Sequence, residues 1–300
     1  MLYKLERTTM KILIFGTGVI GSIYAARIAN AGHDVYVYAR GNRLQSLKNK
    51  GLLYIENNSV KKAPVTILDK LNPADIFDYV FVPIRYDQIE TALIELAANK
   101  SPNIVTMVNN PKGYATWEKL IGKGRLLPAF AGAGGMIEDG VLHFAFTPKI
   151  IQSTTLGEVD GTITDRLREL AQLFKLCRIP YKISSNMDAW QKSHVALVVP
   201  LANGIYLDGG DNYTTAKNKK AIRMMSETLR KYITALKRKG IPIIPPSLNI
   251  FRFCPLWIMD ISLRIICGTK LAETMTSHVH CIKEEIALLD KAFNEITQMN

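Results

Sequence analysis

Residues 11–21 read Lys-Ile-Leu-Ile-Phe-Gly-Thr-Gly-Val-Ile-Gly, a short apolar run that passes directly into a glycine-rich turn. Residues 20–31 then repeat apolar side chains at helical spacing and stop at Gly32, and residues 35–39 form a second apolar run. An apolar strand, a tight turn, a helix and a second strand in this order predict a βαβ unit.

The turn fits the pattern G-x-G-x-x-G, and its position between a strand and a helix makes the pattern informative. Gly16 permits the tight turn, Gly18 lets a pyrophosphate approach the backbone, and Gly21 lets the helix pack closely. The amide groups at the start of the helix face the anion. We therefore predict a dinucleotide site that is formed by Gly16, Thr17, Gly18, Val19, Ile20 and Gly21.

The end of the second strand predicts which dinucleotide fits. A carboxylate there would bind the ribose 2′-hydroxyl and repel a 2′-phosphate. The strand ends instead in Arg40, with Arg43 close behind, and Asp34 lies at the opposite end of the strand. Arginine can hold a phosphate through several N–H donors, so we expect NADP rather than NAD, with Arg40 as a cofactor-binding residue.

The rest of the N-terminal half continues the alternation of strands and helices. Strands are expected at 65–68, 79–84 and 104–108, with helices near 42–50, 86–99 and 114–121. Residues 126–160 read as antiparallel strands with a hairpin turn at Glu138-Asp139-Gly140, and the chain after 184 reads as helix. The predicted class is α/β, with a Rossmann-type NADP-binding domain at 1–184, in which 1–9 are a leader, and an all-helical domain at 185–300.

Composition and charge narrow the classes of protein to which this chain could belong. The net charge is +12, and most of the excess positive charge lies between 217 and 239, a segment with nine basic residues and one acidic residue. The apolar spacing there favours a helix with a solvated basic face over a nucleic-acid site. No secretory signal precedes residue 10, and charges and prolines interrupt residues 241–268, which we expect to be buried helix or loop. The four cysteines and five histidines have no metal-ligand spacing, so we expect a cytoplasmic protein with reduced thiols, no metal and no membrane contact.

The order of several motifs resembles that of the ketopantoate reductases. It comprises the Gly16–Gly21 fingerprint, Arg40 at the strand end, Asn110 after the fifth strand, Leu156-Gly157-Glu158, Trp190-Gln191-Lys192 and Glu284-Glu285-Ile286. The resemblance covers nearly the whole chain and implies NADPH in the cleft between two domains and hydride delivery to the ketone of a 2-oxo acid. A homodimer is left open.

Lys192 is the expected catalytic acid. On a helix that begins at Asn186 it shares a face with Ala189, Val195 and other apolar residues, which would desolvate its ammonium and lower its pKa unless it snorkels. The resemblance implies that this lysine protonates the product oxygen and that Glu285 supports it by hydrogen-bonding to the lysine or to the substrate. Glu284 is expected to be dispensable.

The remaining expected site residues contact substrate or cofactor. Asn110 follows a strand at the edge where α/β folds bind ligands, and the resemblance implies contacts with nicotinamide and substrate. Arg85, at the end of strand 79–84, is expected to contact the cofactor, whereas a plain loop role stays open for both residues. His194 and Asn203, with Thr276, are polar residues that could contact a substrate.

The chain also departs from the family pattern. Two asparagines one and two turns beyond the lysine would fall at Ala196 and Pro200, and a carboxylate-binding serine would fall near Glu273. A carboxylate facing the cleft at 273 would repel a 2-oxo acid. Three readings therefore stay open: reduction of 2-dehydropantoate, reduction of another small ketone or oxo acid, and a non-catalytic NADP-binding sensor.

Overall fold

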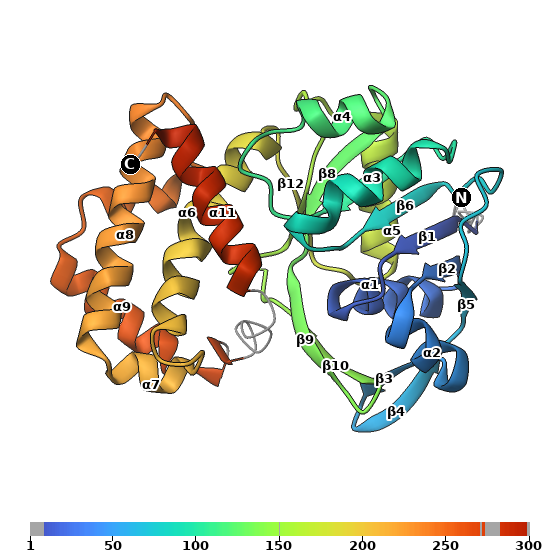
Figure 1. The fold of residues 1–300 in the computed structure, drawn as a ribbon, viewed down its shortest axis with the longest axis horizontal. Coiled ribbons are helices and arrows are strands. Elements are labelled where there is room, and N and C mark those ends of the chain that lie inside the picture. The colour runs from blue at the N-terminus through green and yellow to red at the C-terminus, as the bar shows by residue number, and fades with distance from the viewer. Residues whose placement is uncertain (1–8, 150, 271, 274–282, 299–300) are drawn as a thin grey trace, which may run out of the picture.

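The computed structural model describes residues 9–149, 151–270, 272–273 and 283–298. A half built on strands is followed by a half built on helices, and the two lie side by side (Figure 1). The last strand ends at Ile183 and the next helix begins at Met187, so the boundary predicted at 184 falls between them. Residues 1–8 of the expected leader, and Thr276, lie outside the described residues.

The main sheet has eight strands in the order β12-β11-β8-β7-β6-β1-β2-β5. Their bounds are β1 Lys11–Phe15, β2 Asp34–Tyr38, β5 Val65–Leu68, β6 Tyr79–Val82, β7 Ile104–Met107, β8 Leu126–Phe130, β11 Thr154–Leu156 and β12 Tyr181–Ile183. The six strands from β5 to β8 are parallel and have the order of a dinucleotide-binding fold. The Rossmann-type prediction is confirmed.

Alternate residues of β1 enter different cores, because both faces of the sheet are covered. Ile12 and Ile14 pack with helices α1 (Val19–Asn30) and α5 (Asp165–Leu176). Leu13 and Phe15 pack on the other face with α3 (Ile89–Ala97) and α4 (Ala115–Ile121). A strand that is buried on both sides reads as a continuous apolar run, as residues 12–15 do.

A second sheet of four strands, β4-β3-β10-β9, packs on α1. Its strands are β3 Leu52–Glu56, β4 Ser59–Ala63, β9 Ala133–Glu138 and β10 Val141–Phe146. The predicted turn at Asp139-Gly140 joins β9 to β10 in an antiparallel pair. The sequence analysis missed β3 and β4. Its antiparallel prediction for β8 holds for the pairing with β11 and is wrong for the pairing with β7, which is parallel.

The second half consists of helices. They are α6 Met187–Tyr206, α7 Asn212–Lys217, α8 Lys219–Arg238, η2 Pro246–Arg252, α9 Leu256–Cys267 and α11 Lys283–Thr297. Two further elements of the first half are α2, Gly41–Lys50, and the short turn η1, Tyr86–Gln88. As predicted, α6 begins after Asn186, whose side chain accepts a hydrogen bond from the Ala189 amide.

Packing of α6, α8 and α11 makes the core of the helical half, with Val195, Leu229 and Phe293 at its centre. Figure 1 shows α11 between the sheet half and α8. None of the described helices is both long and apolar enough to span a bilayer. The expectation that residues 241–268 are buried is wrong for α9, because one of its faces is open to solvent and Trp257 is 62% exposed.

Candidate active site

The three fingerprint glycines have three distinct steric roles. Gly16 has a φ of +109°, and a Cβ there would lie 2.6 Å from Ile84 Cγ2. A Cβ on Gly21 would lie 1.9 Å from the carbonyl oxygen of Gly16, so glycine is needed for α1 to pack on the turn. A Cβ on Gly18 would meet nothing within 4 Å. The space in front of Gly18 is therefore open to a ligand that approaches the backbone.

The start of α1 suits an anion. The first turn contains no acidic residue, and Gly18 stands at the N-cap, so the first amides of the helix are available to phosphate oxygens. Thr17 Oγ1 is buried and has no hydrogen-bond partner among the described residues. A cavity of about 590 Å³ begins at this loop and extends along the ends of β1 and β2, where Tyr38, Arg40 and Arg43 line it. These features fit a bound dinucleotide.

Arg40 and Arg43 both line this cavity, but they differ in exposure and in hydrogen-bond partners. The Arg40 side chain is 59% exposed, and its guanidinium pairs with Glu95 of α3 and donates a 3.0 Å hydrogen bond to the Tyr38 hydroxyl. Arg43 is held against the fingerprint, because its Nε donates to the Thr17 carbonyl at 2.9 Å. Burial lowers the pKa of Arg43. Arg40 is therefore the more exposed cation and could exchange Glu95 for a phosphate.

Arg85 and Glu285 meet where β6 ends. Arg85 donates to Asp87 at 2.9 Å and lies 3.6 Å from Glu284, while its neighbour Ile84 lines the cavity. Glu285 is 8% exposed and accepts a 3.0 Å hydrogen bond from the Tyr86 amide. Burial raises the pKa of Glu285, and the Tyr86 hydrogen bond opposes that rise. Glu285 thus joins α11 to the end of β6, whereas the Glu284 side chain is 89% exposed.

Asn110 is fully buried after β7, but its side chain is engaged within its own loop. Its Nδ2 donates to the Gly113 carbonyl at 2.7 Å, and its Oδ1 accepts from the Lys112 amide at 3.0 Å. Its backbone amide donates to Gln191 Oε1 on α6 at 3.2 Å. The neighbouring Asn109 Oδ1 is buried without a hydrogen-bond partner in the described part of the chain. Asn109 is thus a free acceptor at this edge that the sequence analysis did not single out.

Lys192 lies on α6 one turn past the helix start, and its side chain is 14% exposed. Its ammonium pairs with Asp188 on the same helix. The expected contact between Lys192 and Glu285 is not made, since Glu285 binds the Tyr86 amide instead. Asp188 precedes Lys192 by four residues on the same helix and therefore reaches the ammonium without a contribution from α11. Asp188 Oδ1 is buried and has no partner among the described residues. Asp188 was missed, although its i, i+4 spacing from Lys192 was visible.

His194 and Asn203 are both engaged by neighbours. The His194 ring stacks on Trp190 with centroids 5.0 Å apart and lies 4.2 Å from Phe130, at the end of β8. Burial lowers the pKa of His194 to about 4, so the ring is neutral near pH 7. Asn203 donates to Asp290 of α11 at 3.1 Å and thereby joins the two helices.

The residues at the positions that depart from the family pattern are either buried or hydrogen-bonded. Ala196 is fully buried in the core between α6 and α11, and Pro200 is also buried. The Glu273 carboxylate accepts a 2.8 Å hydrogen bond from the Tyr213 hydroxyl of α7. It is therefore engaged on the α7 side of the helical half.

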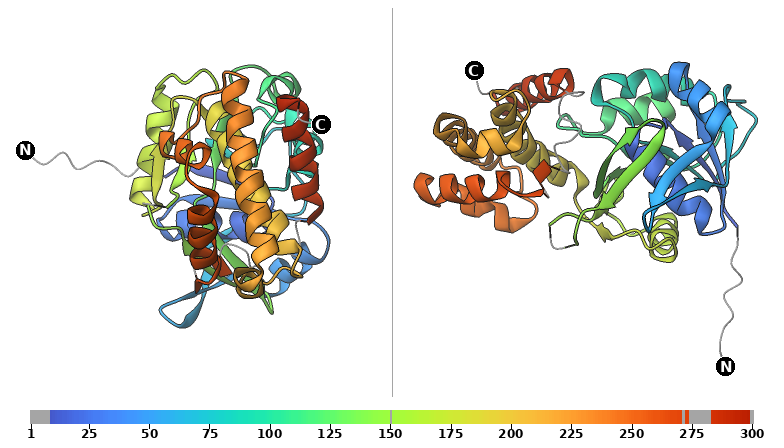
Figure 2. Two further views of the ribbon diagram at one scale, coloured as in Figure 1. Left: turned by 90° about the vertical axis from the view of Figure 1, so that its left-hand side faces the viewer. Right: turned by 90° about the horizontal axis from the view of Figure 1, so that it is seen from below.

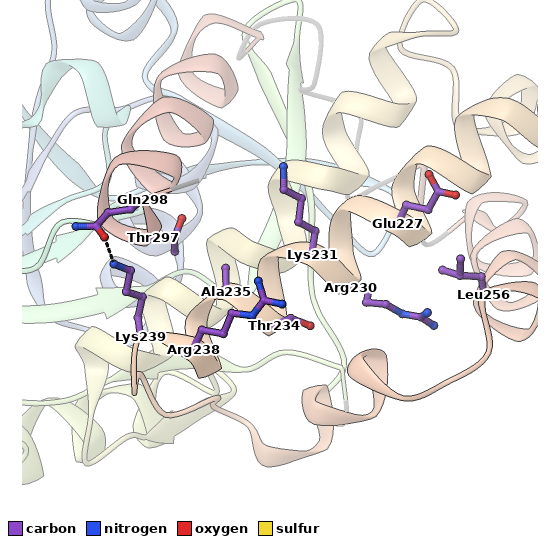
Figure 3. Close-up of a pocket in the computed structure, with 10 residues that line it drawn as sticks. All are labelled: Glu227, Arg230, Lys231, Thr234, Ala235, Arg238, Lys239, Leu256, Thr297 and Gln298. Carbon is purple, nitrogen blue, oxygen red and sulfur yellow. Dashed lines mark hydrogen bonds between the residues drawn. The ribbon is translucent and has the colours of Figure 1, made fainter. Parts of the chain in front are cut away.

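A second cavity, of about 680 Å³, lies between α8, Leu256 and the end of α11 (Figure 3). Lys231, Arg238 and Lys239 line it, so it is part of the basic α8 surface, and Lys239 donates to Gln298. None of the predicted site residues lines it. Within the described ranges, no cluster of His, Cys, Asp and Glu could hold a metal ion.

Comparisons with known proteins identify relatives of this chain. The family model described as ketopantoate reductase PanE/ApbA matches residues 12–161, half of the chain. The 2-dehydropantoate 2-reductase of Mesorhizobium japonicum is 33% identical over 137 residues, which are 45% of this chain and 38% of that protein. That of Pyrococcus abyssi is 26% identical over 247 residues, which are 81% of this chain and 79% of that protein.

Two solved structures share the fold over nearly the whole chain. The 2-dehydropantoate 2-reductase from Geobacter metallireducens GS-15 has a TM-score of 0.69 at 16% identity, covering 96% of this chain and 99% of that one. A D-mandelate dehydrogenase with NADH and anilino(oxo)acetate also has a TM-score of 0.69, at 15% identity, covering 95% and 99%. At these identities the likeness establishes the fold alone.

Proposed function

This chain belongs to the ketopantoate reductase family, and from that premise we propose that it is a cytoplasmic NADPH-dependent reductase of a small 2-oxo acid. The leading substrate is 2-dehydropantoate, whose reduction to pantoate would place the protein in pantothenate biosynthesis. The observation that supports an enzyme most directly is the Lys192–Asp188 pair beside a loop that carries the free acceptor Asn109. A buried, partly unsatisfied polar cluster at this sheet edge is typical of a substrate site.

The chain's own residues divide the work of binding. The amides at Gly18 and the start of α1 would hold the pyrophosphate, and Arg40, released from Glu95, would hold the 2′-phosphate. When bound, the cofactor supplies the hydride. Asn109 and Asn110 stand at the end of β7, where they would position the substrate; Asn110 does so through the loop that its side chain closes.

Lys192 would move the proton. Its protonated ammonium can donate to the ketone oxygen as negative charge develops there, which lowers the barrier of the reduction. Asp188 neutralises and orients that ammonium in the resting protein. Glu285 would hold α11 against η1 and so close the site from the other side.

The test is NADPH oxidation with a panel of 2-oxo acids that includes 2-dehydropantoate. Lys192→Ala should lower kcat by about 10²- to 10⁴-fold and leave the Kd for NADPH within about twofold. The matched control is Lys231→Ala, an exposed lysine of α8 outside this site, which should leave both constants unchanged. NADPH binding without turnover of any ketone would instead identify a sensor, and equal turnover by Lys192→Ala would refute the assigned acid.

One observation supports a second class of substrate, a small ketone or oxo acid other than 2-dehydropantoate. The positions of the two family asparagines are occupied by the buried, apolar Ala196 and Pro200, which offer no side-chain donor to a substrate. A different small ketone or oxo acid would then be preferred. A kcat/KM for another acid that exceeds the value for 2-dehydropantoate would establish this alternative.

A further inference from the structure

The outer side of η2 and α9 carries an apolar surface, which we call the α9 face. Its members are all large apolar side chains with 37–74% of their area exposed: Ile250, Phe253, Trp257, Ile258, Ile261, Ile265 and Ile266. Exposed apolar side chains that occur singly are normal, but a contiguous set along one helix marks an interaction surface. Figure 1 and the right view of Figure 2 place α9 at the margin of the helical half, away from the fingerprint loop.

The two charged groups of α9 are held by other helices, and the exposed Ser262 donates to the Ile258 carbonyl of its own helix at 2.9 Å. Asp260 accepts from Ser226 Oγ and pairs with Arg223, both at 2.6 Å, so its carboxylate is held against α8. Arg264 donates to the Ala216 carbonyl on the α7 side at 3.3 Å. The opposite side of α9 already buries Met259, Leu263 and Cys267. The helix therefore has two apolar sides, and the described part of the fold covers one of them.

We propose that the α9 face binds the same face of a second copy of this chain. Trp257, Ile261 and Ile265 recur every four residues and form one stripe along the helix. Two antiparallel α9 helices with Ile261 on a two-fold axis would place each Trp257 opposite an Ile265 of the other copy. A two-fold interface needs only a surface that complements itself, and this stripe is symmetric about Ile261.

The area of the α9 face fits a stable dimer. Scaling the full area of each side chain, roughly 150–250 Å² for a large one, by its exposed fraction gives about 600–1,000 Å² on each chain. Stable interfaces bury about 800 Å² per partner. The antiparallel arrangement also sets the start of each helix near the end of the other, so their dipoles attract.

The test is sedimentation velocity of the full chain from low to high micromolar concentration. The wild-type protein should be a dimer, and Ile261→Asp, which would place two carboxylates together on the axis, should weaken it by about 100-fold or more. The matched control is Ile94→Asp on α3, because Ile94 is 60% exposed but lies in the sheet half. This control should remain dimeric. Thermal unfolding and circular dichroism verify that each variant folds.

A second measurement locates the contact. Ile261→Cys should form a disulfide-linked dimer on mild oxidation, whereas Ile94→Cys should not. A wild-type protein that stays monomeric at the highest concentration would overturn the proposal, as would a dimer that survives Ile261→Asp. A monomer that binds phosphatidylcholine vesicles through Trp257 would also overturn it and assign the face to a lipid surface.

Discussion

Alanine at two glycines of the fingerprint should affect different properties: at Gly18 it should weaken cofactor binding, and at Gly21 it should lower the stability of the fold. Gly18 has φ −66° and ψ −162°, which alanine adopts freely, and its Cβ would meet nothing within 4 Å. Replacing glycine by alanine at the N-cap costs about 0.5–1 kcal/mol, and the stiffer unfolded chain offsets most of that cost, so Gly18→Ala should change stability by less than about 0.5 kcal/mol. The added methyl occupies the space expected for the pyrophosphate. Losing one or two charge-assisted hydrogen bonds should weaken NADPH binding by about 10- to 100-fold.

Gly21→Ala should damage the fold instead. Its Cβ would lie 1.9 Å from the Gly16 carbonyl oxygen, where real Cβ contacts under 3.0 Å essentially do not occur. The start of α1 would have to move by about 1 Å, and overpacking of this kind costs about 1–3 kcal/mol. For a chain of this length that lowers the Tm by about 2–5 °C.

Differential scanning fluorimetry of the free protein and a fluorescence titration with NADPH measure both effects. Gly18→Ala should keep the wild-type Tm and lose affinity, and Gly21→Ala should lose Tm before any ligand is added. If Gly18→Ala binds NADPH as tightly as the wild type, the pyrophosphate does not lie on this turn and the site reasoning fails. A Gly21→Ala variant as stable as the wild type would show that α1 relaxes more easily than the structure indicates.

Arg40→Ala should weaken NADPH by about 10- to 100-fold and leave NADH nearly unchanged, and Glu95→Gln should tighten NADPH because it frees Arg40; equal losses for both cofactors would contradict this. The lowered pKa of His194, about 4 against about 6.5 unfolded, means that unfolding takes up a proton below pH 6.5. Stability should thus fall by up to about 3 kcal/mol from pH 6.5 to pH 4, and His194→Gln should remove that part of the slope in urea titrations. Arg166→Ala should destabilise by about 3 kcal/mol, because it leaves the buried Glu158 carboxylate without its cation; a change under 1 kcal/mol would indicate that water replaces the guanidinium.

The parallel core of the fold was predictable because local signals and the global fold agree there. Residues 12–15 are apolar without interruption, and the glycines after them mark the turn. The hairpin of β3 and β4 was missed because β4 is mostly polar and exposed, so alternation is weak. Its turn was nevertheless readable: Asn57 and Asn58 have φ of 52° and 58°, the conformation that a two-residue hairpin requires.

The hydrogen-bond partners of the predicted site residues could not be read from the sequence. Lys192 and Glu285 were both singled out, but the sequence analysis did not predict their partners, which are Asp188 and the Tyr86 amide. Asp188 pairs with the Lys192 ammonium because it lies one turn away on the same helix. The Tyr86 amide, in contrast, reaches Glu285 only through tertiary packing. The exposed side of α9 was misjudged for a related reason, since an apolar helix reads the same whether the fold or another molecule covers it.

Gln191 connects the beginning of α6 to the main sheet through its side chain. Its amide donates to the carbonyls of Val108 and Ala129, and its oxygen accepts from the Asn110 amide, so one side chain fastens the first turns of α6 to two strand ends. Lys192, the next residue, is thereby anchored to the sheet although it belongs to the helical half. Motions of the outer helices would therefore displace Lys192 little relative to the ends of β7 and β8, so the proton donor that we propose would stay in register with these strand ends.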